Sequence, residues 1–260
     1  MNLSKGNQEI IRRMPLLEAL QACGGYYQCP KDKEGNRLGP LVGYAGRDEK
    51  GRQFVGDTYL NMAALEEYPH ILWPFVGMLN DTLSSGRNGL SDRVFCGAPL
   101  GGMALASFMA LRAYGRYVFP EKEVLDVATH LTREKSRLVF DRRHEIHEGD
   151  QVVVVEDVCN NFSTTKELIK LISSYGGLVV AIACLANRSL TIHKNYDYPI
   201  SQTEGQLIPI RTLMDKPIPQ YSQDDQAVVA DVTAENVIWK PKDKWAELMD
   251  VMNSAGTVSP

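Results

Sequence analysis

The feature that most constrains the fold is an uninterrupted run of four valines at 152–155. β-branched side chains favour extended backbone, and a run without polar alternation predicts a strand that is buried on both faces. A second apolar strand is expected at 178–185, and helical spacing lies between the two, with Thr164 and Glu167 as a capping box. Strand, helix and strand of this length form a βαβ unit, whose strands lie parallel. The run therefore predicts an α/β fold.

The chain upstream of this unit shows the same alternation. Residues 94–97 (VFCG) are typical of a buried strand, residues 98–102 (APLGG) of a loop, and residues 103–115 of a helix, followed by a strand at 116–119 (RYVF). Together with the βαβ unit, these segments predict a core at 91–214, built as a parallel sheet flanked by helices on both faces.

Two further segments complete the expected single domain of residues 1–260. Residues 1–90 predict an N-terminal hood, with a helix after Pro15, turns and an exposed hairpin at 30–57, and an amphipathic helix after Pro69. Residues 215–260 form a C-terminal extension of loops, in which Pro241 opens a helix. That helix is expected to dock on the body of the protein, because its apolar residues share one face: Trp245, Leu248, Met249 and Met252.

Composition excludes several kinds of partner. The net charge is −4 and Lys and Arg are interspersed with acids, so a nucleic-acid partner is not expected. The uncharged stretch 94–111 is broken by Gly and Pro near its start, which argues against a membrane span. Five scattered cysteines without a CxxC pair, and a start without a secretory pattern, favour a reducing, cytoplasmic setting. No protein metal site is expected, since the closely spaced pair of histidines lacks a third ligand.

Polar residues gather where the valine strand ends. Glu156 and Asp157 close the strand, a short polar loop follows, and Thr164 and Thr165 begin the next helix. Ligands of open α/β sheets bind at the carboxyl ends of the strands, and a helix N-terminus attracts phosphate through free N–H groups and its dipole. Two carboxylates beside such a helix predict a sugar-phosphate site, in which the acids accept hydrogen bonds from hydroxyls.

These residues carry a resemblance to a known family. The run VVVVEDVCNNFSTT resembles the ribose-phosphate signature of type I phosphoribosyltransferases, and VFCGAPLGGMALA resembles their strand and pyrophosphate loop. The segments GGYYQC and DTYLNMAALEEYP resemble the N-terminal part of orotate phosphoribosyltransferases, and LANRS resembles the position from which an arginine reaches the base. The matches span roughly residues 20–214.

The resemblance implies transfer of the phosphoribosyl group of phosphoribosyl pyrophosphate (PRPP) to orotate or a related nucleobase. It also implies Mg²⁺ bound through the pyrophosphate, small-molecule partners and a homodimer. The residues it assigns to catalysis are Glu156, Asp157, Lys122, Arg133 and Lys135. Those it assigns to PRPP are Asn160, Asn161, Phe162, Ser163, Thr164, Thr165, Ala98, Pro99, Leu100 and Gly101, and those it assigns to the base are Tyr26, Tyr27 and Arg188.

The three basic residues belong to a polar segment, 121–148, that is expected to act as a lid. For the family's basic motif, residues 119–124 fit the spacing from the pyrophosphate loop, whereas residues 132–137 fit the charge. The phosphate loop differs from the family pattern, because Asn160-Asn161-Phe162 stands where the family usually has Thr-Thr-Gly. The Cβ of Phe162 makes a positive φ costlier there than at glycine, whereas Asn160 or Asn161 can tolerate the left-handed conformation and donate side-chain hydrogen bonds.

Two other functions fit the same pattern. A purine phosphoribosyltransferase would use the same sugar-phosphate site with another base. A non-catalytic regulator would bind PRPP or a nucleotide on the same fold without turnover, and fold alone does not distinguish it from an enzyme.

Overall fold

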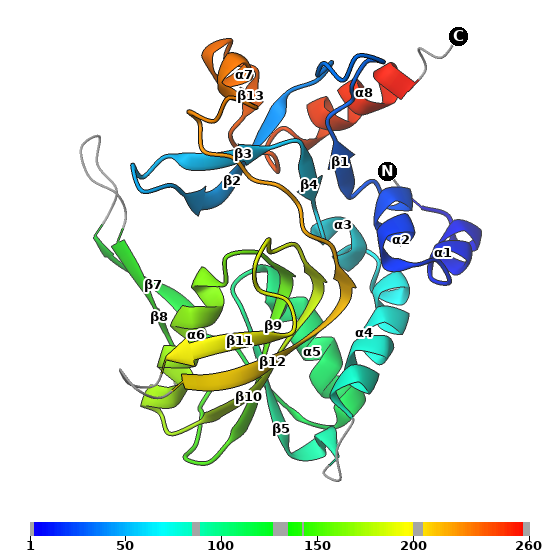
Figure 1. Ribbon diagram of the computed structural model, residues 1–260. Coiled ribbons are helices and arrows are strands. Elements are labelled where there is room, and N and C mark those ends of the chain that lie inside the picture. The colour runs from blue at the N-terminus through cyan, green and yellow to red at the C-terminus, as the bar shows by residue number, and fades with distance from the viewer. Residues whose placement is uncertain (1–2, 85–88, 127–134, 142, 200–204, 257–260) are drawn as a thin grey trace.

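A six-stranded sheet forms the centre of the computed structural model, which describes residues 3–84, 89–126, 135–141, 143–199 and 205–256 (Figure 1). The strand order is β11 (Asn195–Pro199), β12 (Gly205–Asp215), β10 (Leu178–Asn187), β9 (Gln151–Cys159), β5 (Arg93–Gly97) and β6 (Arg116–Val118). All neighbours pair in parallel except β11, which runs antiparallel to β12 at one edge. The expected parallel sheet is confirmed, with this antiparallel edge added.

Helices cover both faces of the sheet, as predicted. Helices α4 (Pro69–Leu83) and α5 (Gly101–Ala113) pack on one face, and α6 (Ser163–Ser174) packs on the other (Figure 1). The valine run divides between the two layers, because Val153 and Val155 pack toward α4 and α5 while Val152 and Val154 pack toward α6. Each apolar layer thus fixes the carboxyl end of β9 from its own side.

The N-terminal hood lies beyond the carboxyl edge of the sheet (Figure 1). Its elements are α1 (Lys5–Ile11), α2 (Leu16–Ala22), β1 (Tyr26–Gln28), β2 (Leu41–Arg47), β3 (Gln53–Gly56), β4 (Thr58–Leu60) and α3 (Ala63–Glu66). Strand β1 pairs with β4, and β2 with β3, in antiparallel hairpin-like ladders. The predicted hairpin is present, but the first four residues of β2 are buried instead of exposed.

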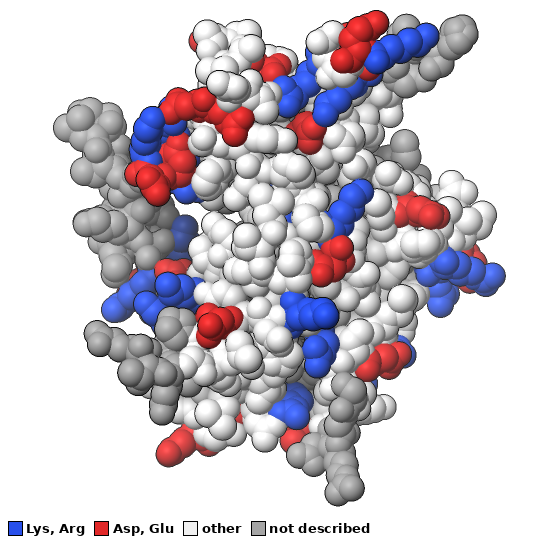
Figure 2. Space-filling model, in the orientation of Figure 1, with Lys and Arg blue, Asp and Glu red and all other residues white. Residues whose placement is uncertain are grey.

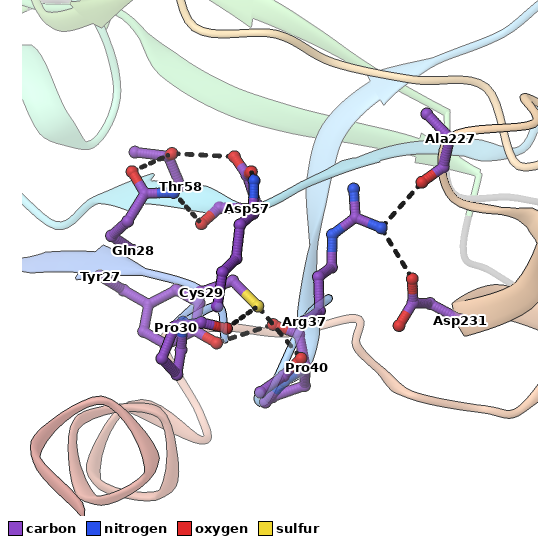
Figure 3. A network of polar contacts seen from close by, with 12 residues as sticks. Tyr27, Gln28, Cys29, Pro30, Arg37, Pro40, Asp57, Thr58, Ala227 and Asp231 are labelled. Carbon is purple, nitrogen blue, oxygen red and sulfur yellow. Dashed lines mark hydrogen bonds and ion pairs between the residues drawn. The ribbon is translucent and has the colours of Figure 1, made fainter. Parts of the chain in front are cut away.

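The C-terminal extension returns to the hood. It contains α7 (Val229–Thr233), β13 (Val237–Ile238) and α8 (Trp245–Gly256), and β13 adds a parallel strand to β2. Leu248 of α8 is fully buried in a cluster with Tyr27 and Val42, so the helix docks on the hood and not on the six-stranded sheet. Arg37 joins the two parts, since its guanidinium donates to the Ala227 carbonyl (2.8 Å) and pairs with Asp231 (2.9 Å) (Figure 3).

The remaining elements lie at the periphery. A short 3₁₀ helix, η1 (Leu90–Asp92), precedes β5, and β7 (Glu121–Asp126) pairs antiparallel with β8 (Lys135–Val139). The expected lid segment is thus built partly as a two-stranded arm. On the face shown in Figure 2, Lys and Arg are scattered among acidic and uncharged residues. Within the described ranges, no helix is both long enough and apolar enough to span a membrane.

Candidate active site

A pocket of about 270 Å³ opens at the carboxyl ends of β9 and β10, beneath the hood. Five parts of the chain form its wall: the hood strands, the end of β9, the start of α6, the residue after β10 and the C-terminal extension. The lining residues are Tyr44, Ala45, Gly46, Tyr59, Leu60, Glu156, Asp157, Val158, Cys159, Asn160, Asn161, Phe162, Ser163, Thr164, Thr165, Arg188 and Lys242. The pocket therefore occupies the edge at which open α/β sheets bind ligands.

All eight residues predicted from the β9–α6 segment line this pocket. They are Glu156, Asp157, Asn160, Asn161, Phe162, Ser163, Thr164 and Thr165, joined by Arg188 from the end of β10. Because β9 and β10 are parallel neighbours, their carboxyl ends deliver these residues to one edge of the sheet.

The turn into α6 takes a left-handed conformation at Phe162, with φ 57° and ψ 21°. Phe162 thus adopts the conformation that its Cβ makes costly, and neither Asn160 nor Asn161 has a positive φ. The Phe162 side chain is buried against the α6 side of the sheet and stacks on Tyr196, with ring centroids 5.3 Å apart. Burying a phenylalanine contributes about 1.5–3 kcal/mol, which offsets the roughly 1–2 kcal/mol cost of a left-handed residue. The buried ring therefore anchors the turn against Tyr196.

Helix α6 begins at Ser163, which corrects the predicted capping box. Thr164 lies inside the first turn, and the residue before the helix, Phe162, offers no side-chain cap. Asn161 caps instead, because its Oδ1 accepts from the Ser163 N–H (3.2 Å) and hydroxyl (3.0 Å). The first backbone hydrogen bond of the helix runs from the Lys166 N–H to the Phe162 carbonyl. The N–H groups of Thr164 and Thr165 precede that bond and suit an anion at the positive end of the helix.

The two acids at the end of β9 differ in their surroundings. Burial raises the pKa of Glu156 well above its usual range, and the negative charge of Asp157 raises it further. Asp157 Oδ1 accepts a hydrogen bond from the Val158 N–H at 2.7 Å. The pocket therefore holds one carboxyl that favours the protonated form beside one that accepts hydrogen bonds.

The predicted pyrophosphate loop lies next to this pair but does not line the pocket. Its residues are Ala98, Pro99, Leu100 and Gly101. The Ala98 N–H donates to the Val155 carbonyl (2.8 Å), and Leu100 is exposed. A side chain at position 101 would overlap the Asp157 carboxylate, so a glycine is required for this close approach. Helix α5 starts at that glycine, two residues earlier than the predicted start at Met103.

Arg188 is a buried cation on the pocket wall. Its side chain is held over the ring of Tyr44, with Cζ 3.8 Å from the ring centroid, and the residue is 5 % exposed. Its Nε and Nη2 atoms have no hydrogen-bond partner among the described residues. These two donors form one edge of the guanidinium fork, which matches a carboxylate or a pair of carbonyl oxygens.

The structure does not bring Tyr26 and Tyr27 to the pocket. Tyr27 is fully buried in the hood and donates its hydroxyl to the Pro40 carbonyl at 2.7 Å (Figure 3). The Tyr26 hydroxyl donates to Gln28 Oε1 at 3.0 Å. Tyr44 and Tyr59 take the wall positions instead. Tyr59 belongs to the DTYL segment that already resembles the family, whereas no local pattern marks Tyr44.

The basic residues expected in the lid lie away from the pocket wall or outside the described chain. Lys122 is an exposed residue of β7, Lys135 is the first residue of β8, and Arg133 lies outside the described residues. Two other charged residues were missed. Lys242 lines the pocket from the C-terminal extension, and Glu66 of α3 lies near Asp157.

Glu66 is a partly buried acid with an unsatisfied atom. Its Oε1 is buried, and no residue in the described ranges forms a hydrogen bond with it. Burial raises the pKa of Glu66 to about 7, the charge of Asp157 adds to this, and Lys242 opposes it. In the part of the chain that the structure describes, no group of three or more His, Cys, Asp or Glu residues is arranged to hold a metal ion.

Comparison with known proteins gives curated relatives named orotate phosphoribosyltransferase. No family model matches the chain. It is 31% identical over 133 residues to the orotate phosphoribosyltransferase of Caldanaerobacter subterraneus subsp. tengcongensis, which covers 51% of this chain and 62% of that protein. It is 27% identical over 167 residues to the orotate phosphoribosyltransferase of Caldicellulosiruptor saccharolyticus. This match covers 64% of this chain and 74% of that protein. The chain thus spans less than two thirds of the first of these relatives.

Solved structures are more distant. The crystal structure of orotate phosphoribosyltransferase from Aeropyrum pernix is 18% identical, with a TM-score of 0.47, covering 77% of this chain and 93% of that one. The crystal structure of adenine phosphoribosyltransferase from Trypanosoma brucei is 12% identical, with a TM-score of 0.48. The match covers 90% of this chain and 94% of that one. The resemblance found in the sequence is confirmed by the curated relatives: over about half its length, the chain is similar to orotate phosphoribosyltransferases.

Proposed function

We propose that the protein transfers the phosphoribosyl group of PRPP to orotate or a related nucleobase, releasing pyrophosphate. One observation carries the proposal: a single pocket joins the start of α6, the carboxyl pair at the end of β9 and the unsatisfied guanidinium of Arg188. These three parts match the three parts of a nucleotide, namely phosphate, pentose and base. The names of the curated relatives support the same reaction.

The phosphate and pentose are bound by adjacent parts of the chain. The 5′-phosphate accepts hydrogen bonds from the N–H groups of Thr164 and Thr165 and from nearby hydroxyls, at the positive end of α6. Asp157 accepts a hydrogen bond from a ribose hydroxyl, and Glu156 pairs with the neighbouring hydroxyl. Mg²⁺ enters with the substrate, bound through its pyrophosphate.

The base lies on the hood side of the pocket. The free edge of Arg188 pairs with the carboxylate of orotate, which satisfies two buried donors at once. The rings of Tyr44 and Tyr59 pack beside the base. A purine lacks this carboxylate, and therefore leaves the arginine unsatisfied.

The reaction needs no covalent nucleophile. The bond between the anomeric carbon and the pyrophosphate oxygen breaks, and its electrons leave with the pyrophosphate. A ring nitrogen of the base forms the new bond, and the proton that this nitrogen carried passes to the pyrophosphate or to water. The protein holds both reactants in line and stabilises the charge that develops. In this proposal the β7–β8 arm acts as a lid of the site, and Lys122, Arg133 and Lys135 serve catalysis, as the resemblance implies. A homodimer in the cytoplasm, as the resemblance implies, belongs to the same proposal.

The test is turnover of an Asp157→Asn variant, measured as pyrophosphate release with orotate, uracil and adenine. We expect release with orotate and a loss of about 100-fold or more in kcat/KM for the variant, because its amide replaces a charged acceptor in the transition state. Asp92→Asn is the matched control, since Asp92 is exposed and precedes the amino end of β5.

Each other outcome changes the assignment. Full activity of Asp157→Asn would remove the proposed site. Release with adenine alone would redirect the proposal to a purine phosphoribosyltransferase. Binding of PRPP by the wild-type protein without release with any base would favour the non-catalytic regulator.

A further inference from the structure

The C-terminal extension crosses the rim of the pocket. After β12, residues 216–221 run from the end of β10 toward the hood (Figure 1). The Ile218 N–H donates to the Arg188 carbonyl (3.2 Å), and Gln220 Oε1 accepts from the Asn160 side chain (2.9 Å). The next residue then forms a bridge with hood strand β3. This segment therefore contacts both the residue after β10 and the phosphate loop before it reaches the hood.

The extension comes back to the pocket between β13 and α8. There Lys242 lines the wall, on an exposed turn that precedes α8. The buried packing of Leu248 holds α8 against the hood, which fixes the position of this turn. Among the described residues no salt bridge includes Lys242, whereas its neighbour Lys244 pairs with Glu247. Lys242 therefore shares the pocket wall with Glu156 and Asp157 without an ion pair of its own in this part of the chain.

The charges on the wall make this position important. The cations that line the pocket among the described residues are Arg188 and Lys242. Arg188 is 5 % exposed, lies over the ring of Tyr44 and is assigned to the base in the proposed function, whereas Lys242 is exposed. A ligand with one phosphate at α6 and a diphosphate near Asp157 places several negative charges beside two acids. An exposed ammonium on that side reduces the repulsion.

We propose that Lys242, carried by the C-terminal extension of the same chain, binds the diphosphate of the sugar-phosphate substrate. This inference rests on the proposed function for the identity of the substrate. The positive charge of the ammonium stabilises the charge on the departing oxygen. The extension thereby becomes part of the substrate site, although it lies outside the residues that resemble the family.

The experiment measures binding by calorimetry with Mg²⁺ and three probes: PRPP, pyrophosphate and ribose 5-phosphate. For Lys242→Gln we expect affinity for PRPP and pyrophosphate to fall about 10- to 100-fold, since a charged hydrogen bond is lost. Affinity for ribose 5-phosphate should stay within about twofold, because α6 holds that phosphate. Lys242→Arg keeps the charge and should retain most of the affinity. Lys240→Gln is the matched control, since Lys240 is exposed two residues earlier and lines another surface pocket.

The outcomes separate this inference from the proposed function. If wild-type protein releases pyrophosphate with a base while Lys242→Gln binds PRPP and pyrophosphate as Lys240→Gln does, the role of Lys242 is wrong and the transferase stands. If pyrophosphate binding depends on Lys242 but no base is accepted, the diphosphate site stands and the transferase falls. An equal loss for all three probes would overturn a diphosphate-specific role.

Discussion

Glu66 shows how burial tunes a single residue at the edge of the site. Its carboxyl lies near Asp157, and one of its oxygens is buried without a partner. Its pKa rises from 4.5 to about 7, mainly because burial disfavours the charged form. Between pH 4.5 and about pH 7, the Glu66 carboxyl is protonated in the folded protein but has lost its proton in the unfolded chain. The free energy of unfolding therefore falls as pH rises through this window.

We predict that Glu66→Gln removes this pH dependence. At pH 4.5 and below, the variant and the wild-type protein should have similar stability, since the wild-type carboxyl is then largely neutral when folded. At pH 8 the variant should be more stable by about 1 kcal/mol, a value reduced for partial exposure. Urea unfolding across this range measures the difference. Glu67→Gln, at the exposed neighbouring position, serves as control, and an equal pH profile for the two variants would contradict the assignment.

At the level of elements, the turn from β9 into α6 is where the structure departs most from the family pattern. A phenylalanine occupies a left-handed position that glycine usually fills, and stacking on Tyr196 holds it there. An alanine variant is usually more stable than a glycine variant, and we expect the opposite order of stability at position 162. Both variants lose the buried ring, but only glycine also relieves the left-handed backbone.

We predict that Phe162→Ala destabilises the protein by about 3–5 kcal/mol and that Phe162→Gly is about 1 kcal/mol more stable than the alanine variant. Lys170, exposed within α6, provides the comparison pair, and there glycine should be about 1 kcal/mol less stable than alanine. Urea unfolding of the four variants measures the difference in stability between alanine and glycine at each position. A glycine variant less stable than the alanine variant at position 162 would show that backbone strain is negligible in this turn.

Elements with strong local patterns were predictable from the sequence. The valine run, the helix after it and the next apolar strand correspond to β9, α6 and β10. The sequence pattern of β11 and β12 predicts strands less clearly, because Pro209 lies within β12 and much of that strand is only partly buried. The β7–β8 arm is likewise polar, so no apolar alternation marks it. Both pairs depend on strand pairing, which a local pattern does not encode.

At the scale of the whole molecule, the pocket is formed by the hood, the core and the extension together. Asp157 and Thr164 were predictable because they lie within one short segment of sequence. Tyr44 and Lys242 were not, because they reach the wall only through the packing of α8 and β13 on the hood. Contacts of this kind join residues that are distant in the chain, and no spacing in the sequence reports them.

A site shared between hood and core predicts that a ligand protects both. With PRPP and Mg²⁺ at 100 times the dissociation constant, binding stabilises the protein by about 2.7 kcal/mol. Amides at 44–46 in β2 and at 163–165 in α6 should then exchange at least about tenfold more slowly, as measured by hydrogen exchange. Helix α1, which contributes no residue to the pocket, serves as the unprotected control. Protection confined to 163–165 would mean that the hood does not close on the ligand, and that the tyrosine and lysine positions on the wall take no part in binding.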